Sequence, residues 1–230
     1  MSDYNIKKLT WDSIFFGYEI GKIEINNGLN KEEILNSIKK SPFEMVQLFS
    51  NKKLESSYKY NPIDVKLTYS KKVPKYTTSN NFIKSVNKDF EDSLVKLSKE
   101  AGIYSRYKSD KNLSFKFEEM YEIWMNKSLK RKLASEVFAY QIKKKIIGMI
   151  TVKQQLKNAE IGLVAVDNKL QSKGIGRQLL QTAENWALKQ NLENIFVTTQ
   201  EENYKACNFY KNNKYIIYNK TYIYHIWKNL

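Results

Sequence analysis

EIGLVAVDNKLQSKGIGRQLLQTAENWA, the segment from Glu160 to Ala187, carries the strongest structural pattern in this sequence. Residues Ile161 to Val166 form a short apolar run that ends in branched side chains, which predicts a strand buried on both faces. From Ile175 onward, apolar residues recur at three- and four-residue spacing, which predicts an amphipathic helix. The chain therefore passes from strand to helix through the letters QSKGIG.

This turn has the features of a phosphate-binding site. The first N–H groups of a helix lack intrahelical partners and carry partial positive charge, so they bind anions. Gly174 and Gly176 allow the backbone to curl and to approach a phosphate closely. Lys173 and Arg177 add positive charge beside them. We therefore expect the turn to bind a pyrophosphate group.

Two other phosphate-binding motifs do not match. A Walker A loop requires Lys and then Ser or Thr after its last glycine, whereas Gly176 is followed by Arg177 and Gln178. A dinucleotide-binding fingerprint requires three glycines and an acidic residue after the next strand, whereas the segment 195–200 ends in Thr-Thr-Gln. The alternative that remains is a plain strand-turn-helix in which the glycines serve only the turn.

The residues Gln171 to Gly176 match the Q/R-x-x-G-x-G/A signature of the GNAT N-acetyltransferases, and the sequence is identified as resembling that family. The match continues through Asn203, Ala206 and Tyr210, which are similar to the family's N-x-x-A-x-x-x-Y segment. The resemblance implies an α/β fold with a mixed central sheet flanked by helices, and acetyl-CoA as cosubstrate. Its expected acetyl-CoA ligands are Val164, Val166, Gln171, Lys173, Gly174, Ile175, Gly176, Arg177 and Asn203.

A narrower resemblance, to the dTDP-fucosamine acetyltransferase group, extends along nearly the whole chain. It rests on the order of several short motifs, with Tyr107 where Phe is expected and Lys173 where Arg is common. It implies acetylation of a sugar amine on a nucleotide-linked deoxyhexose, in the supply of a surface polysaccharide. The motifs are Leu9–Ser13, Phe15–Gly17, Ser105–Tyr107 with Asp110, Tyr121 with Trp124, Ser128–Leu129, and Tyr224–Trp227.

Tyr210 is the expected general acid for the departing CoA thiolate. A phenol with a pKa near ~10 stays protonated at neutral pH and can donate its proton, and the family motif carries Tyr at this position. The alternative is that Tyr210 only packs beside Phe209. A backbone N–H near Val166 is the expected oxyanion donor. No general base is assigned, and a structural role is expected for His225.

Three residues are expected to bind the acceptor. Arg106 carries a planar guanidinium that suits the diphosphate of a nucleotide sugar, and the alternative is a surface ion pair. Tyr107 adjoins it in the same motif. Tyr121 lies with Trp124 on a predicted helix of the kind that overhangs the acceptor in these enzymes, and the alternative is a plain core stripe.

The basic charge of the chain does not indicate nucleic-acid binding. The formal net charge is +15, from 39 basic and 24 acidic residues. Only Arg106, Arg131 and Arg177 are arginines, whereas base-reading sites favour Arg. The lysines are scattered along the chain. The charge is therefore expected to attract anionic small molecules such as CoA and nucleotide sugars.

Cysteine and histidine content exclude two kinds of structural site. The single Cys207 excludes an internal disulfide, and His225 is the only histidine, so no zinc cluster and no metal are expected. The chain has no leader-like start and no apolar run near the ~18 residues of a membrane span. A cytoplasmic protein that does not contact the membrane is expected, as a monomer or a homodimer.

Hydrophobic periodicity divides the chain into two expected units. Residues 1–80 are expected to form a small α/β unit, a partial copy of the same fold, and residues 81–230 the GNAT domain, with a polar linker at 71–81. Residues 11–17 are interpreted as a loop with a buried aromatic side. The expected helices are 31–39, 89–101, 117–133, the one from 175, and 204–211; the expected strands are 6–9, 18–25, 45–49, 62–69, 137–142, 146–152, 161–166, 195–199, 215–218 and 222–227.

The favoured function is transfer of acetyl from acetyl-CoA to the amine of a dTDP-4-amino-4,6-dideoxyhexose. Two alternatives stay open: acetylation of another amine, such as a different nucleotide amino sugar, a peptide or an antibiotic, and a non-catalytic CoA-binding module. The intact residues Gly174, Gly176, Asn203 and Tyr210 argue against the second alternative.

Overall fold

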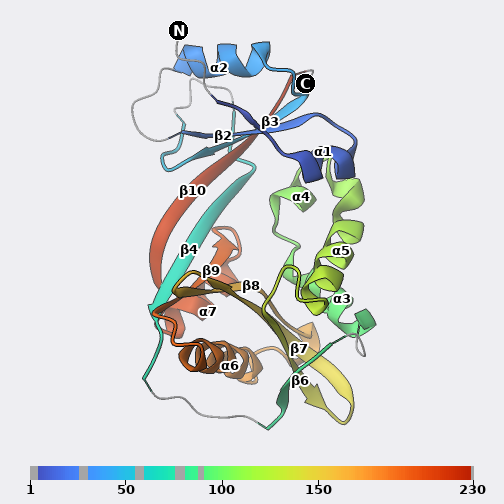
Figure 1. Cartoon of the computed structure of the whole chain (residues 1–230), viewed down its shortest axis with the longest axis vertical. Helices are drawn as coiled ribbons and strands as arrows, with labels where there is room; N and C mark the ends of the chain where they lie inside the picture. Colours follow the sequence, from blue (N-terminus) through green and yellow to red (C-terminus); the bar gives the residue numbers. More distant parts are fainter. Residues whose placement is uncertain (1–4, 26–30, 55–59, 76–80, 88–90, 229–230) are drawn as a thin grey trace.

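The computed structural model describes residues 5–25, 31–54, 60–75, 81–87 and 91–228. Within them the strands form one mixed sheet, in the order β1-β2-β3-β10-β4-β9-β8-β7-β6-β5 (Figure 1). The pairs β2–β3 and β8–β9 are parallel, and the other neighbours are antiparallel. Helices flank the sheet, which confirms the expected fold class.

The described elements follow the predicted order closely. The strands are β1 (Lys7–Lys8), β2 (Ile20–Ile25), β3 (Met45–Ser50), β4 (Asp64–Lys72), β5 (Ile83–Ser85), β6 (Glu136–Ile142), β7 (Lys145–Gln155), β8 (Asn158–Val166), β9 (Asn194–Gln200) and β10 (Ile216–Trp227). The helices are α1 (Thr10–Phe16), α2 (Lys31–Lys40), α3 (Glu91–Ala101), α4 (Arg106–Ser109), α5 (Phe117–Leu129), α6 (Ile175–Lys189) and α7 (Tyr204–Asn212), with short 3₁₀ turns η3 (Ser114–Lys116) and η4 (Asn168–Leu170).

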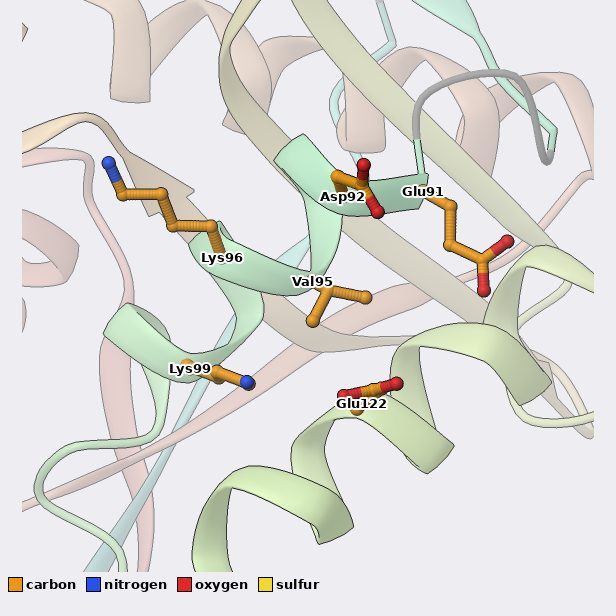
Figure 2. A pocket seen from close by; sticks show the side chains of 6 residues that line it. All are labelled: Glu91, Asp92, Val95, Lys96, Lys99 and Glu122. Atoms are coloured by element: carbon orange, nitrogen blue, oxygen red, sulfur yellow. The ribbon is translucent and has the colours of Figure 1, made fainter.

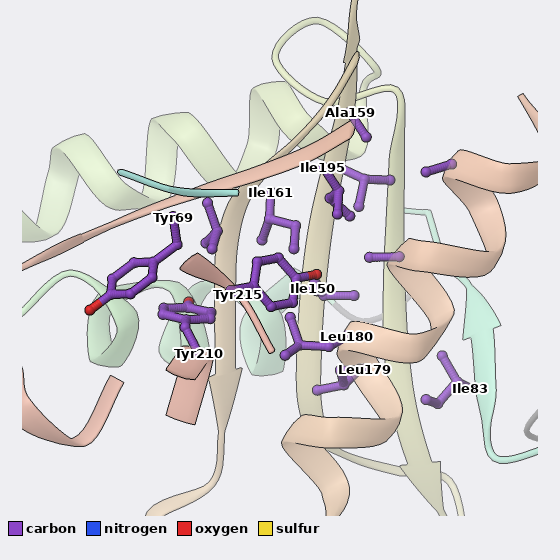
Figure 3. Packing of buried hydrophobic residues seen from close by; sticks show 14 of the residues in the cluster. Tyr69, Ile83, Ile150, Ala159, Ile161, Leu179, Leu180, Ile195, Tyr210 and Tyr215 are labelled. Carbon is purple, nitrogen blue, oxygen red and sulfur yellow. The ribbon is translucent and has the colours of Figure 1, made fainter. Parts of the chain in front are cut away.

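Two apolar layers cover opposite faces of the sheet. Side chains of α6 and α7 pack with those of β4, β7, β8 and β9, and Figure 3 shows Leu179, Leu180 and three tyrosines at this contact. Helices α3 and α5 pack on the other face, against β6 and β7 and the half-buried Leu163 of β8. Because α6 is apolar on one side only, its buried residues, Leu179 and Ala183 among them, fix which side faces the sheet.

The segment 11–17 was interpreted as a loop, and this was wrong. It forms helix α1, which Gly17 ends in the left-handed conformation with φ 78°. Phe15 and Phe16 are buried, as expected, and Trp11 is half-buried and stacks on Phe15 with ring centroids 4.8 Å apart. Trp11 and Phe15 have helical i, i+4 spacing, but seven residues are too few for that spacing to repeat and to predict a helix.

The closing strands 215–218 and 222–227 are in fact one strand, β10, with a register irregularity between Ile217 and Asn219. The polar residues between them, Asn219 and Lys220, pair with Thr68 and Leu67 of β4. A polar stretch can therefore continue a strand where a neighbouring strand supplies hydrogen bonds on one side.

The sheet crosses the expected boundary near residue 80, because the C-terminal strand β10 lies between β3 and β4 of the N-terminal segment. The predicted linker overlaps Lys71 and Lys72, which belong to β4, and residues 76–80 of it lie outside the described residues. The division into an N-terminal unit and a GNAT domain stays a prediction about how the chain is organised.

Candidate active site

Strands β8 and β9 separate partway along their length. They pair from Asn158 to Ile161 against Asn194 to Val197, and no further. Beyond this point β8 continues to Val166 on β7, whereas β9 continues to Gln200 on β4. An edge of each strand is therefore left without a strand partner in the described part of the sheet, which is the condition for pairing with an extended ligand.

A β-bulge in β8 accounts for the separation. Between the pairs Ile150–Val164 and Val152–Ile161, the two residues Gly162 and Leu163 oppose the single residue Thr151. The N–H of Leu163 donates to the Thr151 hydroxyl at 2.9 Å instead of to a backbone carbonyl. A Cβ at Gly162 would lie 2.9 Å from the same hydroxyl, so the position favours glycine. A bulge bends its strand, and here it turns β8 away from β9.

The prediction that segment 161–166 is buried on both faces was only half right. Ile161 is 2% exposed, but the residues from Leu163 to Val166 are half-buried. The apolar letters do not reveal that a neighbouring strand diverges, because the divergence depends on β9 and Thr151. Val164 and Val166 still pack toward α6, whereas Leu163 and Ala165 face α3.

The turn before α6 adopts the conformation expected for anion binding. Ser172 (φ 62°) and Gly174 (φ 78°) are both left-handed, and Gly174 is the residue that precedes the helix. Lys173, Gly174 and Arg177 are exposed. The helix is 15 residues long, so its first N–H groups and its dipole are directed at solvent beside two cationic side chains. This arrangement fits a pyrophosphate.

Gly176 connects the turn to the strand opening. A Cβ there would lie 3.1 Å from the Phe209 ring and 3.9 Å from Val166. The helix start therefore lies against the end of β8, and the glycine serves close packing as well as backbone conformation. The side-chain nitrogen Nε2 of Gln171 donates to the backbone carbonyl of Val166 at 3.2 Å. The predicted CoA residues on β8 and in the turn are thus brought together, and Ile175 is buried beneath them.

Asn203 begins helix α7. Its side-chain oxygen accepts the backbone N–H of Ala206 at 3.1 Å, which is an N-cap interaction. This bond accounts for Asn at this position through local structure alone. Its expected contact with CoA stays a prediction.

Tyr210 projects from α7 into the core and is 3% exposed. Its ring lies 5.5 Å from that of Tyr69 and 6.0 Å from that of Tyr215 (Figure 3). Burial, then the neighbouring Cys207 and Tyr69, raise the pKa of Tyr210 well above its usual value. The phenol is therefore protonated at neutral pH, the form a general acid requires, and its catalytic role stays a prediction.

The expected acceptor residues lie together on the other face of the sheet. The Nη2 of Arg106 donates to the Tyr107 hydroxyl at 2.7 Å, and that hydroxyl donates to Asp12 at 3.0 Å. The Tyr107 ring stacks on Phe16 at 5.7 Å. Tyr121 is 5% exposed, and a Cβ at Gly102 would collide with its ring. Arg106 is therefore part of a polar cluster beneath α4, not of a surface ion pair.

The two predicted sites meet at the bulge. Leu163 packs against the same apolar cluster that contains Tyr107 and Tyr121, whereas its neighbours Val164 and Val166 pack on the α6 side. The expected cosubstrate residues and acceptor residues thus occupy opposite sides of the opened end of β8.

Several buried polar residues beside Arg106 are not among the residues predicted from sequence. Gln47 (1% exposed) and Asp64 (6% exposed) belong to β3 and β4, and His225 of β10 is paired with Asp110. Their sequence signal is a polar residue within an otherwise apolar strand segment, as in MVQLFS and YHIW. Polar side chains are usually exposed, so a polar residue in such a segment is unexpected. His225 had been assigned a structural role from its position in a strand.

A separate surface hollow of about 270 Å³ lies between α3 and α5. Figure 2 shows its lining, which is charged with both signs and contains none of the predicted site residues. The lining residues are Glu91, Asp92, Val95, Lys96, Lys99 and Glu122. It shares no residue with the strand opening or the start of α6, so we do not assign it to the active site.

The opened strand pair has the exposed start of α6 on one face and a buried polar cluster on the other. The family model described as Acetyltransferase (GNAT) family matches residues 101–215, which is half of the chain. The chain belongs to this family and is an acetyltransferase.

Solved structures support the fold over the whole chain. A conserved protein of unknown function from Staphylococcus epidermidis superposes with a TM-score of 0.70 at 12% identity, covering 100% of this chain and 93% of its own. A GNAT acetyltransferase from Colwellia psychrerythraea gives 0.56 at 12% identity, over 90% and 76%. The PaiA N-acetyltransferase from Thermoplasma acidophilum, solved with coenzyme A, gives 0.50 at 17% identity, over 63% and 97%. Among curated protein sequences, none matches the chain.

Two further findings concern membranes and metals. None of the helices in the described ranges is long and apolar enough to cross a membrane. Within those same ranges, His, Cys, Asp and Glu side chains do not gather in groups of three that could hold a metal ion.

Proposed function

We propose that this chain is an acetyl-CoA-dependent N-acetyltransferase that acetylates the amine of a nucleotide-linked amino-deoxyhexose. The observation that carries the proposal is the arrangement at the end of β8. Val166 lies beside the α6 start on one face, and Leu163 contacts the cluster of Tyr107 and Tyr121 on the other. A thioester bound along β8 thus has its phosphates on the α6 side and its acetyl group toward the acceptor cluster.

Acetyl-CoA fits the residues that form the opening. The exposed Lys173 and Arg177 and the first N–H groups of α6 suit the pyrophosphate. The unpaired edge from Val164 to Val166 suits the amide-rich pantetheine arm, which would add to β8 like a strand. The Val166 carbonyl accepts from Gln171 in this structure, so Gln171 would move or share that acceptor when the arm binds.

The reaction we propose is direct transfer. The bound ammonium group first loses a proton to water. The neutral amine then attacks the thioester carbonyl carbon, and the C–S bond breaks to release CoA as a thiolate. Tyr210 donates its proton to the thiolate, and the proton from the amine passes to water. A backbone N–H near Val166 stabilises the oxyanion, and holding both reactants at the opening of β8 lowers the entropic cost.

The acceptor we propose is a dTDP-4-amino-4,6-dideoxyhexose, used in surface polysaccharide synthesis. Its support is the resemblance to the dTDP-fucosamine acetyltransferase group, and the finding that the motif residues Arg106, Tyr107 and Tyr121 lie in one cluster. The unpartnered Nε of Arg106 is a donor for an oxygen of the nucleotide sugar. The second candidate is another amine, such as a different nucleotide amino sugar, a peptide or an antibiotic.

A CoA-release assay with acetyl-CoA and a panel of amines tests this proposal. The panel contains dTDP- and UDP-linked 3-amino and 4-amino sugars, a lysine peptide and an aminoglycoside. We expect the highest kcat/KM on a dTDP-4-amino-4,6-dideoxyhexose. Acetylation of the peptide or aminoglycoside with no turnover of nucleotide sugars would replace the proposed acceptor, and the acetyltransferase assignment would stand.

A further inference from the structure

Several buried polar atoms beneath α4 have no hydrogen-bond partner among the described residues. They include the side-chain oxygen and nitrogen of Gln47, both carboxylate oxygens of Asp64, the Nε of Arg106 and the Nε2 of His225. An unsatisfied buried polar atom costs about 1–3 kcal/mol, so native proteins contain few of them. Four such residues in one place indicate a site that a polar ligand completes.

Strand register places three of these side chains in a row. Gln47 of β3 is directly opposite His225 of β10. Asp64 of β4 is opposite Ile223, two residues before His225 and therefore on the same face. Trp227, two residues after His225, packs with Tyr107 and Phe16, so this face is the one that α1 and α4 cover.

Arg106 covers the row from the helical side. Its guanidinium carbon lies 5.8 Å from the ring centre of Phe49, which is opposite Ile223 in the sheet. Burial raises the pKa of Asp64 and lowers that of Lys66, and the charge of Arg106 opposes the first change and adds to the second, as expected for a near neighbour. Helix and sheet thus present their unsatisfied groups to the same region.

Asp110 fixes the role of the His225 ring. The Nδ1 of His225 lies 2.5 Å from Asp110, which also accepts from the Trp227 indole at 3.1 Å and from the Asn112 N–H at 2.8 Å. A carboxylate that accepts three donors requires the proton on Nδ1, which leaves a lone pair on Nε2. Burial lowers the pKa of His225, with Asp110 opposing it. The ring is therefore neutral and Nε2 is a hydrogen-bond acceptor.

The charges of the cluster suit one cation. With a neutral His225, carboxylates outnumber cationic groups in and around the cluster, where the described charges are those of Asp12, Asp64, Asp110, Glu160 and Glu202 against those of Arg106, Lys66 and Lys22. The neutral groups Gln47, Ser105 and His225 add donors and acceptors of the kind that bind hydroxyl groups. The chemistry therefore matches a hydroxylated molecule that carries one amine.

Asp64 lies at the side of this cluster nearest the strand opening. Burial raises the pKa of Asp64, and the side chain of Gln200, the last residue of β9, is close enough to oppose that rise. Lys66 on the same strand is near Glu160 of β8. An amine held at Asp64 would therefore face the opening in which the thioester is proposed to lie.

We propose that Gln47, Asp64, Arg106 and His225 form the acceptor-amine site, in which Asp64 binds the ammonium group and the Nε2 of His225 accepts a hydrogen bond from a neighbouring sugar hydroxyl. This site rests on the proposed function, because it is the acceptor half of that enzyme. It identifies the acceptor as an amine next to hydroxyl groups, and it gives His225 a part in binding as well as in structure.

Binding of matched ligand pairs, without turnover, tests the site. The probes are dTDP-4-amino-4,6-dideoxygalactose against dTDP-fucose, and galactosamine against galactose, each measured by calorimetry with acetyl-CoA absent. Within each pair, the ligands differ at one position, an amine against a hydroxyl. We expect the wild type to prefer the amine at least tenfold, and Asp64→Asn to lose that preference while acetyl-CoA binding is unchanged.

Two further variants separate binding from folding. Glu184→Gln removes a buried carboxylate that is satisfied by Lys71 and Tyr215 on the other face, and it should keep the preference for the amine. His225→Asn keeps a donor for Asp110 but lacks the Nε2 acceptor, and it should weaken both nucleotide-sugar ligands about tenfold. Equal binding of amine and hydroxyl by the wild type, or an amine preference that survives Asp64→Asn, overturns the proposal.

Failure of this site is distinguishable from failure of the proposed function. If galactosamine is preferred and the preference depends on Asp64, but no nucleotide sugar is acetylated, the site stands and the proposed acceptor falls. If a nucleotide amino sugar is acetylated with the same KM by wild type and Asp64→Asn, the function stands and the site falls.

Discussion

At the scale of single residues, Tyr210 is the side chain whose role can be tested most sharply. Its phenol is buried and protonated, and Tyr215 in the same cluster is a matched control because its hydroxyl bonds to Glu184 at 3.1 Å. We expect Tyr210→Phe to lower kcat on the order of 100-fold, since loss of a general acid has effects of this size, and to leave the Kd of acetyl-CoA unchanged.

The measurement is steady-state kinetics alongside calorimetric binding of acetyl-CoA. Tyr215→Phe should lower thermal stability and leave kcat within about twofold, because it removes a bond within the core. A kcat for Tyr210→Phe equal to that of the wild type would remove Tyr210 from the mechanism.

Asp64 should lower the stability of the free protein at neutral pH. Burial raises its pKa to about 6, against an ordinary value near 3.8, with Arg106 and Lys66 opposing the change. The pKa of this carboxyl is higher in the folded protein than in the unfolded chain. Such a group contributes to stability at a pH below its pKa in the unfolded chain, and this contribution is lost as the pH rises through its pKa in the folded protein, about 6. Two pKa units correspond to about 2–3 kcal/mol.

Urea unfolding of wild type and Asp64→Asn at several pH values measures this contribution. We expect the variant to gain about 2–3 kcal/mol relative to the wild type between about pH 4 and about pH 7. Parallel pH profiles for the two proteins would show that Asp64 is not buried as an unpaired charge. A gain in stability with a loss of amine binding is the pattern of a residue retained for function.

At the scale of elements, the bulge in β8 determines the opening of the sheet. Thr151→Val keeps the shape of the side chain but removes the hydroxyl that accepts the Leu163 N–H. We expect a loss of about 1–3 kcal/mol in the free energy of unfolding, because the N–H is left unsatisfied. The KM for acetyl-CoA should rise about tenfold, because a strand that relaxes toward β9 narrows the opening.

Thr151→Ser is the matched control, since it retains the hydroxyl and loses only a methyl group. It should keep the wild-type KM. Denaturant unfolding and acetyl-CoA kinetics are the two measurements. If Thr151→Val unfolds less easily and binds acetyl-CoA normally, the bulge does not depend on this hydrogen bond.

Periodicity predicted α6 from its sequence, and the same method failed for α1 and β10 for physical reasons. The 15 residues of α6 bury one apolar stripe, so the pattern and the packing agree. In α1, seven residues are too few for the spacing of Trp11 and Phe15 to repeat. In β10, the polar residues Asn219 and Lys220 follow a register irregularity and interrupt the apolar pattern, although they pair with β4.

At the scale of the whole molecule, the net charge of +15 should accelerate the binding of anionic substrates. We expect kcat/KM for acetyl-CoA to fall several-fold when the salt concentration rises from about 0.05 to about 0.5 M, because the Debye length shortens. The thioester S-acetylpantetheine, which lacks the phosphates, is the control and should change little. Equal salt dependence for the two thioesters would show that the charge does not act through the phosphates.

The sheet also explains how distant segments form one site. Strand β10, at the end of the chain, lies between β3 and β4 of the N-terminal segment. This insertion brings His225 beside Gln47 and Asp64, and α4 brings Arg106 over them. The N-terminal segment thus supplies part of the acceptor cluster as well as part of the core.

Local sequence by itself determined the strand-turn-helix from Ile161 to α6, the glycine-containing turn before the helix and the resemblance to the family, because these depend on neighbouring residues and on side-chain periodicity. Tertiary structure alone decided the separation of β8 from β9 and the row formed by Gln47, His225 and Asp64. Pairing between strands sets both features. The bulge opposite Thr151 sets the separation of β8 from β9, and the register of β10 sets the row of polar side chains. The local sequence of a strand does not specify which strands it pairs with or in which register.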